Sequence, residues 1–183
     1  MSNIVSKDIA IEFCKLSDWA YECWITHRNL FDDNRDHENT IGKSKYFTQR
    51  LSIITQEYCL LQISKLHDPA IMRNSLNLTI EYIVRFGCWG QDEKKVSSLQ
   101  NQLSGLWSNI KVARNKSLAH NDLETIMNNA AHGQFTKDLD VKYFEALQEL
   151  VNMVHEKWHS EPYPFNDLAQ ADVEEFLNVL SKD

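Results

Sequence analysis

The chain has 183 residues, a formal net charge of −7, 43% apolar residues and 25% charged residues. This composition is ordinary for a globular protein and excludes wholesale disorder. Five Gly and three Pro are too few for the turns of a sandwich or barrel, so long helices are favoured. No apolar run approaches the ~18 residues of a membrane span. Residues 1–13 contain no apolar signal segment, and we therefore expect a cytoplasmic protein.

Apolar residues recur at three- and four-residue steps along most of the chain, which is typical of amphipathic helices. The pattern predicts helices over residues 7–30, 41–67, 76–86, 92–118, 138–159 and 169–180. Pro69 ends the second helix and Ser75 can cap the third. No strand is expected. The sequence thus predicts an all-α bundle of five to six helices, with residues 1–160 as the main bundle. Residues 161–183 add a hinge and a C-terminal amphipathic helix packed on the same domain.

Two of these helices have wide apolar faces, which predict a two-fold homodimer. The face of the second predicted helix consists of Tyr46, Phe47, Ile53, Ile54, Tyr58, Leu61 and Leu66. The face of the fourth consists of Val96, Leu99, Leu103, Leu106, Trp107, Ile110 and Ala113.

Cysteine spacing and charge distribution indicate which kinds of site the chain could form. None of the four cysteines forms a C-x-x-C pair, and Cys14, Cys23 and Cys59 fall within apolar helical patterns, so we expect buried reduced thiols. Residues 41–120 carry 11 basic and 5 acidic residues, a net charge of +6 within an acidic protein. This basic middle could hold an anion at one place, or it could simply be neutralised by the acidic segments in the fold.

A basic stretch with one histidine, residues 111–122, lies at the end of the fourth predicted helix. Arg114 offers a planar fork of donors that matches phosphate oxygens. His120 can give or take a proton near neutral pH, and Asn115 can orient either a ligand or the imidazole. The alternative is a basic helix terminus, stabilised by the helix dipole. On a regular helix Arg114 and His120 would lie about 120° apart and about 9 Å along the axis. Either the histidine folds back beyond the helix end, or the site takes groups from two chains.

The residues Arg114-Asn-Lys-Ser-Leu-Ala-His120 resemble the R-x4–6-H motif of the HEPN superfamily. The stretch 61–69, Leu-Gln-Ile-Ser-Lys-Leu-His-Asp-Pro, is similar to the region after the second helix in the AbiU-type abortive-infection branch. The resemblance covers most of residues 5–160. It implies an antiparallel bundle that dimerises through the motif-bearing helices.

For active members the resemblance also implies an endoribonuclease that needs no metal and no cofactor. The ribose 2′-hydroxyl attacks its own phosphate and leaves a 2′,3′-cyclic end. His120 would be the general base or acid, Arg114 would stabilise charge on the phosphate, and Asn115 would position one of them. Lys111, Lys116 and Asp122 are the candidate substrate-binding residues. We expect RNA as substrate, in phage defence or in a toxin–antitoxin pair with an antitoxin or other regulatory protein as partner. A catalytically silent dimeric RNA-binding or interaction module is the alternative.

A second motif, His155-Glu-Lys-Trp-His159, satisfies the H-E-x-x-H pattern of zinc metalloproteases. His155 and His159 would bind zinc, Glu156 would be the general base, and Glu174 or Glu175 could be a third ligand. The motif lies at a helix end, followed at once by Glu161-Pro162. It therefore predicts ordinary helix-end histidines rather than a metal site.

Overall fold

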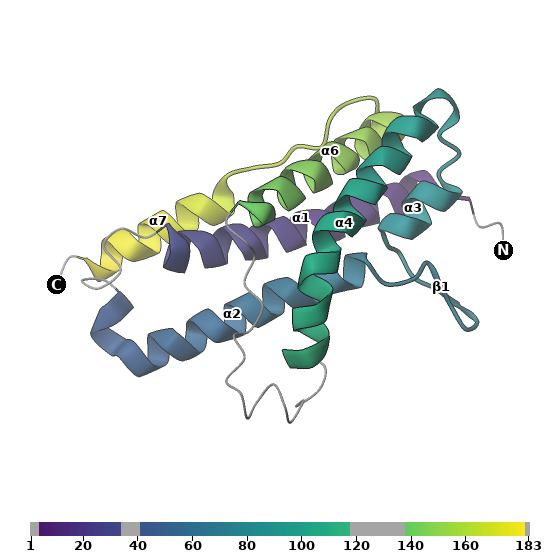
Figure 1. The fold of residues 1–183 in the computed structure, drawn as a ribbon. Coiled ribbons are helices and arrows are strands. Elements are labelled where there is room, and N and C mark those ends of the chain that lie inside the picture. The colour runs from purple at the N-terminus through teal and green to yellow at the C-terminus, as the bar shows by residue number, and fades with distance from the viewer. Residues whose placement is uncertain (1–3, 34–40, 118–137, 182–183) are drawn as a thin grey trace. The chain divides into compact units, whose positions relative to one another are not determined.

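The computed structural model describes residues 4–33, 41–117 and 138–181, and for residues 109 and 112–117 it describes the backbone alone. Among these residues the helices are α1 (Lys7–His27), α2 (Lys45–Leu66), α3 (Ile80–Phe86), α4 (Glu93–Ser117), α6 (Leu139–His159) and α7 (Leu168–Leu180). A π-helical turn, η1 (Arg28–Asp32), continues α1 (Figure 1). The described residues thus confirm the predicted all-α fold.

Contacts within the chain divide it into two compact units. The first unit comprises Met1–Ser17 and Ser64–Tyr163, and the second comprises Asp18–Ile63 and Pro164–Asp183. Helices α1 and α2 each contribute residues to both units. The domain boundary predicted at residue 160 stays a prediction, although the change of unit after Tyr163 falls in the same extended stretch between α6 and α7.

The third predicted helix was placed too early, and the segment before it is a short hairpin. Strands β1 (Ile71–Met72) and β2 (Ser75–Leu76) pair antiparallel, with Ile71 opposite Leu76. Arg73 in the turn has a φ of 55°, the left-handed conformation that such tight hairpin turns require. Helix α3 begins only at Ile80, because the side chain of Thr79 accepts a hydrogen bond from the Tyr82 amide and caps it.

The core of the first unit lies between α4 and α6, and α3 packs beside α4. Leu103 of α4 and Leu150 of α6 are fully buried. Phe13 and Cys14 of α1 belong to the same core, where the Cys14 thiol lies 3.9 Å from the Val151 carbonyl oxygen. The apolar side of α4, from Val96 to Ile110, is therefore covered within the first unit.

An aromatic cluster closes the turn between α3 and α4. The Trp89 indole N–H donates to the Ile83 carbonyl at 3.1 Å, and its ring meets the edge of Trp158 at 5.7 Å. The Lys157 ammonium lies 5.2 Å from both indole rings and donates to the Cys88 carbonyl. A Cβ on Gly87 would come within 2.6 Å of both the Ile83 oxygen and the Trp89 indole nitrogen. Glycine is therefore required at this close approach.

The second unit buries much less of its apolar surface. Within it, Ala20, Trp24, Leu30 and Cys59 are buried. The apolar face of α2 on which the predicted dimer depends is largely exposed, and Tyr46 exposes 79% of its surface. The exposed members of that face are Tyr46, Phe47, Ile53, Ile54, Tyr58 and Leu61. The buried apolar side chains of α2 are Cys59, Leu60 and Ile63, together with Leu66 of the predicted face.

The cysteine prediction is confirmed for Cys14 and Cys59, which are free and buried, while Cys23 is half-buried. Burial and the neighbouring Glu22 carboxylate raise the pKa of the Cys23 thiol to about 11. Cys23 thus stays protonated and weakly nucleophilic at neutral pH. In the described part of the chain no helix is both long and apolar enough to cross a membrane.

The packing of α4 on α6 predicts a large cost for truncating Leu103. Leu103→Ala should lower the free energy of unfolding by about 2–5 kcal/mol, because it leaves a cavity between two long helices. The neighbouring Gln102→Ala removes an exposed side chain and should stay within about 0.5 kcal/mol of the wild type. Urea unfolding followed by circular dichroism measures both, and equal costs would contradict the assignment of this core.

Candidate functional site

The first half of the Arg114–His120 motif lies on the last turns of α4. The helix extends through Ser117, so the backbone of Arg114, Asn115 and Lys116 is helical. Lys111, one turn earlier, is exposed, and Ile110 beside it is buried. The end of α4 thus has its apolar side in the core of the first unit and presents Lys111 to solvent.

The second half of the motif falls outside the described residues. His120 and Asp122 belong to this part of the chain, and the side chains of Arg114, Asn115 and Lys116 are likewise not described. The two arrangements predicted for Arg114 and His120, a folded-back histidine or a site shared by two chains, both stay predictions. The predicted loop 121–137 also lies outside the described residues.

A buried aromatic layer supports α4 two helical turns before Arg114. The imidazole of His67, one residue beyond α2, stacks on the Trp107 indole with 5.1 Å between ring centroids and 9° between planes. Nε2 of His67 and the Tyr143 hydroxyl of α6 share a hydrogen bond of 2.9 Å, and Tyr143 is fully buried. The layer therefore connects the segment after α2 to both α4 and α6. It fixes the rotation of α4 about its own axis two turns before the motif.

Burial determines the charge state of His67. It lowers the pKa of the imidazole to about 4, so the ring is neutral at physiological pH. A neutral ring suits both the stack on Trp107 and a single hydrogen bond to Tyr143. His67 is thus a candidate positioning residue for the motif helix, and sequence reasoning missed it. His67 lies within the stretch 61–69 that carries the family resemblance, which was the available signal.

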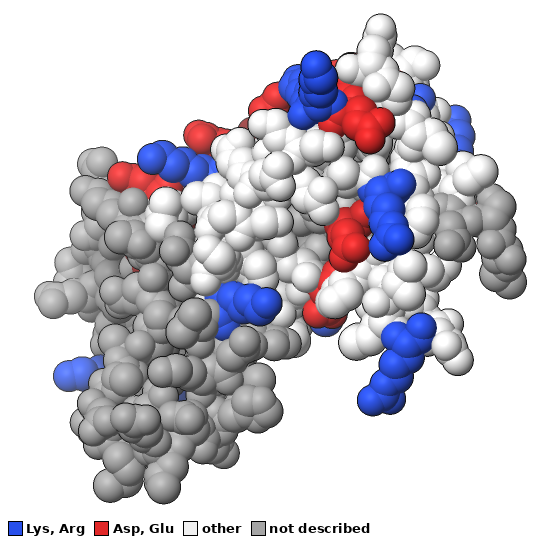
Figure 2. Space-filling model, turned by 45° about the vertical axis from the view of Figure 1, so that its right-hand side comes forward, with Lys and Arg blue, Asp and Glu red and all other residues white. Residues whose placement is uncertain are grey.

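Charges on the described surface are interspersed. In the view of Figure 2, Lys and Arg side chains lie among Asp and Glu side chains, with no continuous basic surface over the described residues seen there. Lys95 pairs with Glu149 at 2.9 Å and Arg85 with Glu81 at 3.7 Å. Two of the basic residues of 41–120, Arg85 and Lys95, are thus paired with acidic side chains.

The H-E-x-x-H residues lie in a packed helix end. The rings of His155 and His159 stack with 4.3 Å between centroids and 4° between planes. Nδ1 of His155 is 2.7 Å from the Glu161 carbonyl oxygen, so Nδ1–H donates to that oxygen, and the Tyr163 ring packs edge-on against His155. Among the described residues no three potential metal-ligating side chains cluster. The packing of His155 fits the predicted role of helix-end histidines.

Comparison with known families gives a match over nearly the whole chain. The sequence model of the HEPN family described as AbiU2 matches residues 7–177. No match was found among curated proteins or among solved structures.

The neutral His67 predicts a loss of stability in acid. The unfolded chain protonates His67 below its ordinary pKa near 6.5, whereas the folded chain does so only near pH 4. The contribution of His67 is therefore fully present above about pH 6.5 and falls by at most about 3 kcal/mol as the pH drops to 4. His67→Phe keeps an aromatic ring on Trp107 and should flatten this part of the pH profile. Urea unfolding of both proteins between pH 4 and 7.5 measures it, and parallel profiles would contradict a buried neutral His67.

Proposed function

Since the chain belongs to the AbiU2 family of HEPN proteins, we propose that it is a metal-independent endoribonuclease that acts in abortive infection. The observation that carries the proposal is the match over residues 7–177, which includes the whole Arg114–His120 motif. The position of Arg114 and Asn115 at the end of a well-supported helix gives further support.

In the proposed reaction the ribose 2′-hydroxyl attacks the adjacent phosphorus and the 5′-oxygen of the next nucleotide leaves. His120 removes the 2′ proton or protonates the leaving oxygen. Arg114 stabilises the negative charge that develops on the phosphate, and Asn115 orients one of these groups. Lys111 and Lys116 contact neighbouring phosphates. The products are a 2′,3′-cyclic phosphate and a free 5′-hydroxyl, with the proton balance closed by the acid and base.

The proposed enzyme is a homodimer, and α2 supplies a face that supports self-association. Tyr46, Arg50, Ile53, Glu57 and Leu61 follow one another at steps of three or four residues and are all exposed or partly exposed. They form one stripe along α2, which we call the α2 stripe.

The α2 stripe is self-complementary. An antiparallel two-fold contact centred between Ile53 and Ile54 would place Arg50 against Glu57 of the partner subunit and Tyr46 against Leu61 of the partner subunit. Both ion pairs then form by symmetry around an apolar centre, as an isologous interface requires. The apolar side of α4 up to Ile110 is buried within the first unit, so among the described residues α2 is the better supported dimer helix.

The chemistry is tested on RNA in the presence of chelator. Arg114→Ala and His120→Ala should each lower cleavage by at least about 100-fold, because one removes charge stabilisation and the other proton transfer. The matched controls Arg85→Ala and His159→Ala remove the same side chains elsewhere and should retain activity. Product ends should be 2′,3′-cyclic phosphates, and a 2′-deoxy substitution at the cleavage position should block the reaction.

Two outcomes would overturn the proposed activity. Binding of RNA that depends on Arg114, without any cleavage by the wild type, would establish the silent binding module instead. Loss of activity on chelation, together with its loss in His159→Ala, would point to a metal enzyme at His155 and His159.

The dimer is tested by charge reversal in the α2 stripe. Arg50→Glu and Glu57→Arg should each weaken the dimer, because like charges then face each other twice across the two-fold axis. The double variant R50E/E57R restores both pairs and should restore the dimer. Sedimentation velocity over a range of concentrations measures this, and a wild type that stays monomeric throughout would exclude the interface.

A further inference from the structure

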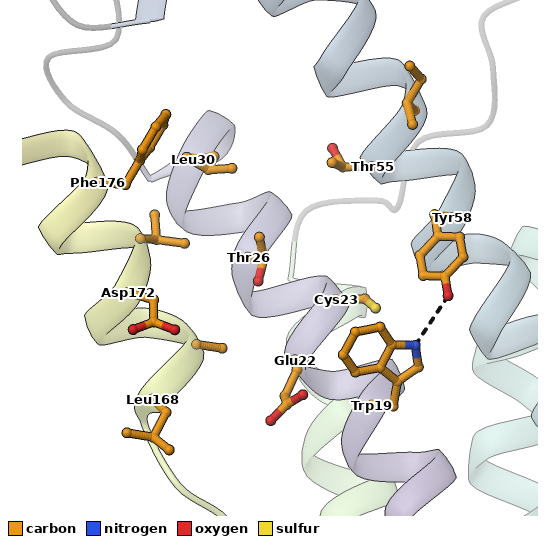
Figure 3. Close-up of a pocket in the computed structure, with 13 residues that line it drawn as sticks. Trp19, Glu22, Cys23, Thr26, Leu30, Thr55, Tyr58, Leu168, Asp172 and Phe176 are labelled. Atoms are coloured by element: carbon orange, nitrogen blue, oxygen red, sulfur yellow. Dashed lines mark hydrogen bonds between the residues drawn. The ribbon is translucent and has the colours of Figure 1, made fainter. Parts of the chain in front are cut away.

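An open groove in the second unit lies apart from the Arg114–His120 motif in the sequence. Helices α1, α2 and α7 line it, and its volume is about 810 Å³. Trp19 and Tyr58 face each other across the gap between α1 and α2, where the Trp19 indole N–H donates to the Tyr58 hydroxyl at 3.3 Å (Figure 3). The thirteen lining residues are Trp19, Glu22, Cys23, Thr26, Leu30, Ile54, Thr55, Tyr58, Leu168, Ala169, Asp172, Val173 and Phe176.

The groove has an apolar floor and apolar rims that remain in contact with water. Leu30 and Val173 are buried in the floor. Leu168 exposes 65% of its surface, Ile54 60% and Phe176 48%. Contiguous exposed apolar side chains of this size mark an interaction site. A small-molecule pocket would enclose most of its ligand, whereas these half-exposed rims suit a long occupant that lies along the groove.

The dimensions of the groove fit a helix. Its wall along α1 and η1 runs from Trp19 to Leu30, about 16 Å at 1.5 Å per residue, which corresponds to three turns. Helices α1, α2 and α7 place apolar side chains toward the groove. A fourth helix bound there would complete a four-helix arrangement. An amphipathic helix in such a groove contacts it with residues spaced at three and four positions.

The acidic residues of the groove indicate which charges a helix bound in it would carry. Glu22 and Asp172 lie among the lining side chains, and no Lys, Arg or His is among the thirteen described residues that line the groove. Helix α7 adds Glu174 and Glu175 and contains no basic residue. Burial, with a smaller contribution from Asp18, raises the pKa of Glu22, which means that its charged form is disfavoured there. A cation beside Glu22 and Asp172 would relieve this cost.

We propose that this groove docks an amphipathic helix of a partner protein, with apolar residues in the groove and Lys or Arg residues beside Glu22 and Asp172. Thr55 and Tyr58 lie about 100° or more around α2 from the centre of the α2 stripe, so a dimer through that stripe leaves these two groove residues uncovered, whereas Ile54 lies at the border between the stripe and the groove. The docking site is independent of RNA cleavage and would connect the protein to a regulatory partner.

The test uses the full chain and two synthetic 16-residue helical peptides. Both have Leu at positions spaced three and four apart, and they differ only in having Lys or Glu beside that apolar stripe. Fluorescence anisotropy of labelled peptide should show at least tenfold tighter binding of the Lys peptide. E22Q/D172N should remove at least tenfold of that preference, and E22K/D172K should reverse it.

Further variants separate the groove from other surfaces. Phe176→Ser should weaken the Lys peptide at least tenfold, whereas Met72→Ser, an equally exposed apolar residue outside the groove, should not. Circular dichroism establishes that each variant is folded, and a variant that is not folded is replaced by Leu168→Ser. Equal binding of both peptides, no binding, or insensitivity to every groove variant would overturn the proposal. So would a wild-type dimer that Phe176→Ser converts to monomer, because a second copy would then be the occupant.

Discussion

The contact between α4 and α6 is the interaction on which the first unit depends. Each helix supplies a continuous row of buried side chains, from Val96 to Ile110 and from Tyr143 to Val154. Burial of one such side chain contributes about 1.5–3 kcal/mol, so the row fixes both helices along several turns. A helix held in this way is a stiff support for groups at its end. Arg114 and Asn115 occupy that position on the backbone of α4.

Polar side chains add a hydrogen bond and a ring stack to this apolar contact. Tyr143 is fully buried, and its hydroxyl shares a hydrogen bond with His67, a contact that contributes about 0.5–1.5 kcal/mol. His67 in turn gives Trp107 a flat surface to stack on. One histidine thus links the end of α2 to both helices of the main contact. The site proposed for catalysis is therefore supported by the same residues that stabilise the core.

The two units differ in how far they bury their apolar side chains. The first unit buries its apolar side chains and holds a rigid helix, which precise chemistry requires. The second unit leaves Tyr46, Ile54 and Leu168 in water, which a monomer would not need for stability. Surfaces of this kind are typical of association, and they are the basis of the dimer proposed through the α2 stripe and of the helix docking proposed in the groove.

Sequence reasoning predicted the long helices well, because α4, α6 and α7 each repeat apolar residues over three or more turns. It misplaced the start of α3, since Ser75 and Thr79 are both good N-caps and local sequence does not choose between them. It expected a dimer through the apolar faces of both α2 and α4, whereas the face of α4 is largely buried within the first unit, because periodicity shows that a side is apolar but not whether a neighbour covers it.

The candidate site likewise has residues that local sequence predicts and residues that it does not predict. Arg114 and His120 were found through a short local motif, whereas the partners of His67 lie 40 and 76 residues away at Trp107 and Tyr143. The groove joins α1, α2 and α7, which are distant in sequence. Features that depend on such long-range contacts could not be predicted from periodicity or spacing.

The contacts of the Trp89 indole determine which segments of the protein unfold together. Helix α3 has seven residues, too few to persist alone in water, and its Ile83 carbonyl is bound by a side chain from the following turn. That side chain packs on Trp158 at the end of α6. Breaking the cluster therefore frees both helix ends together. In hydrogen exchange, the amides of α3 and of the last turn of α6 should open as one cooperative segment, although more than 65 residues of chain separate them.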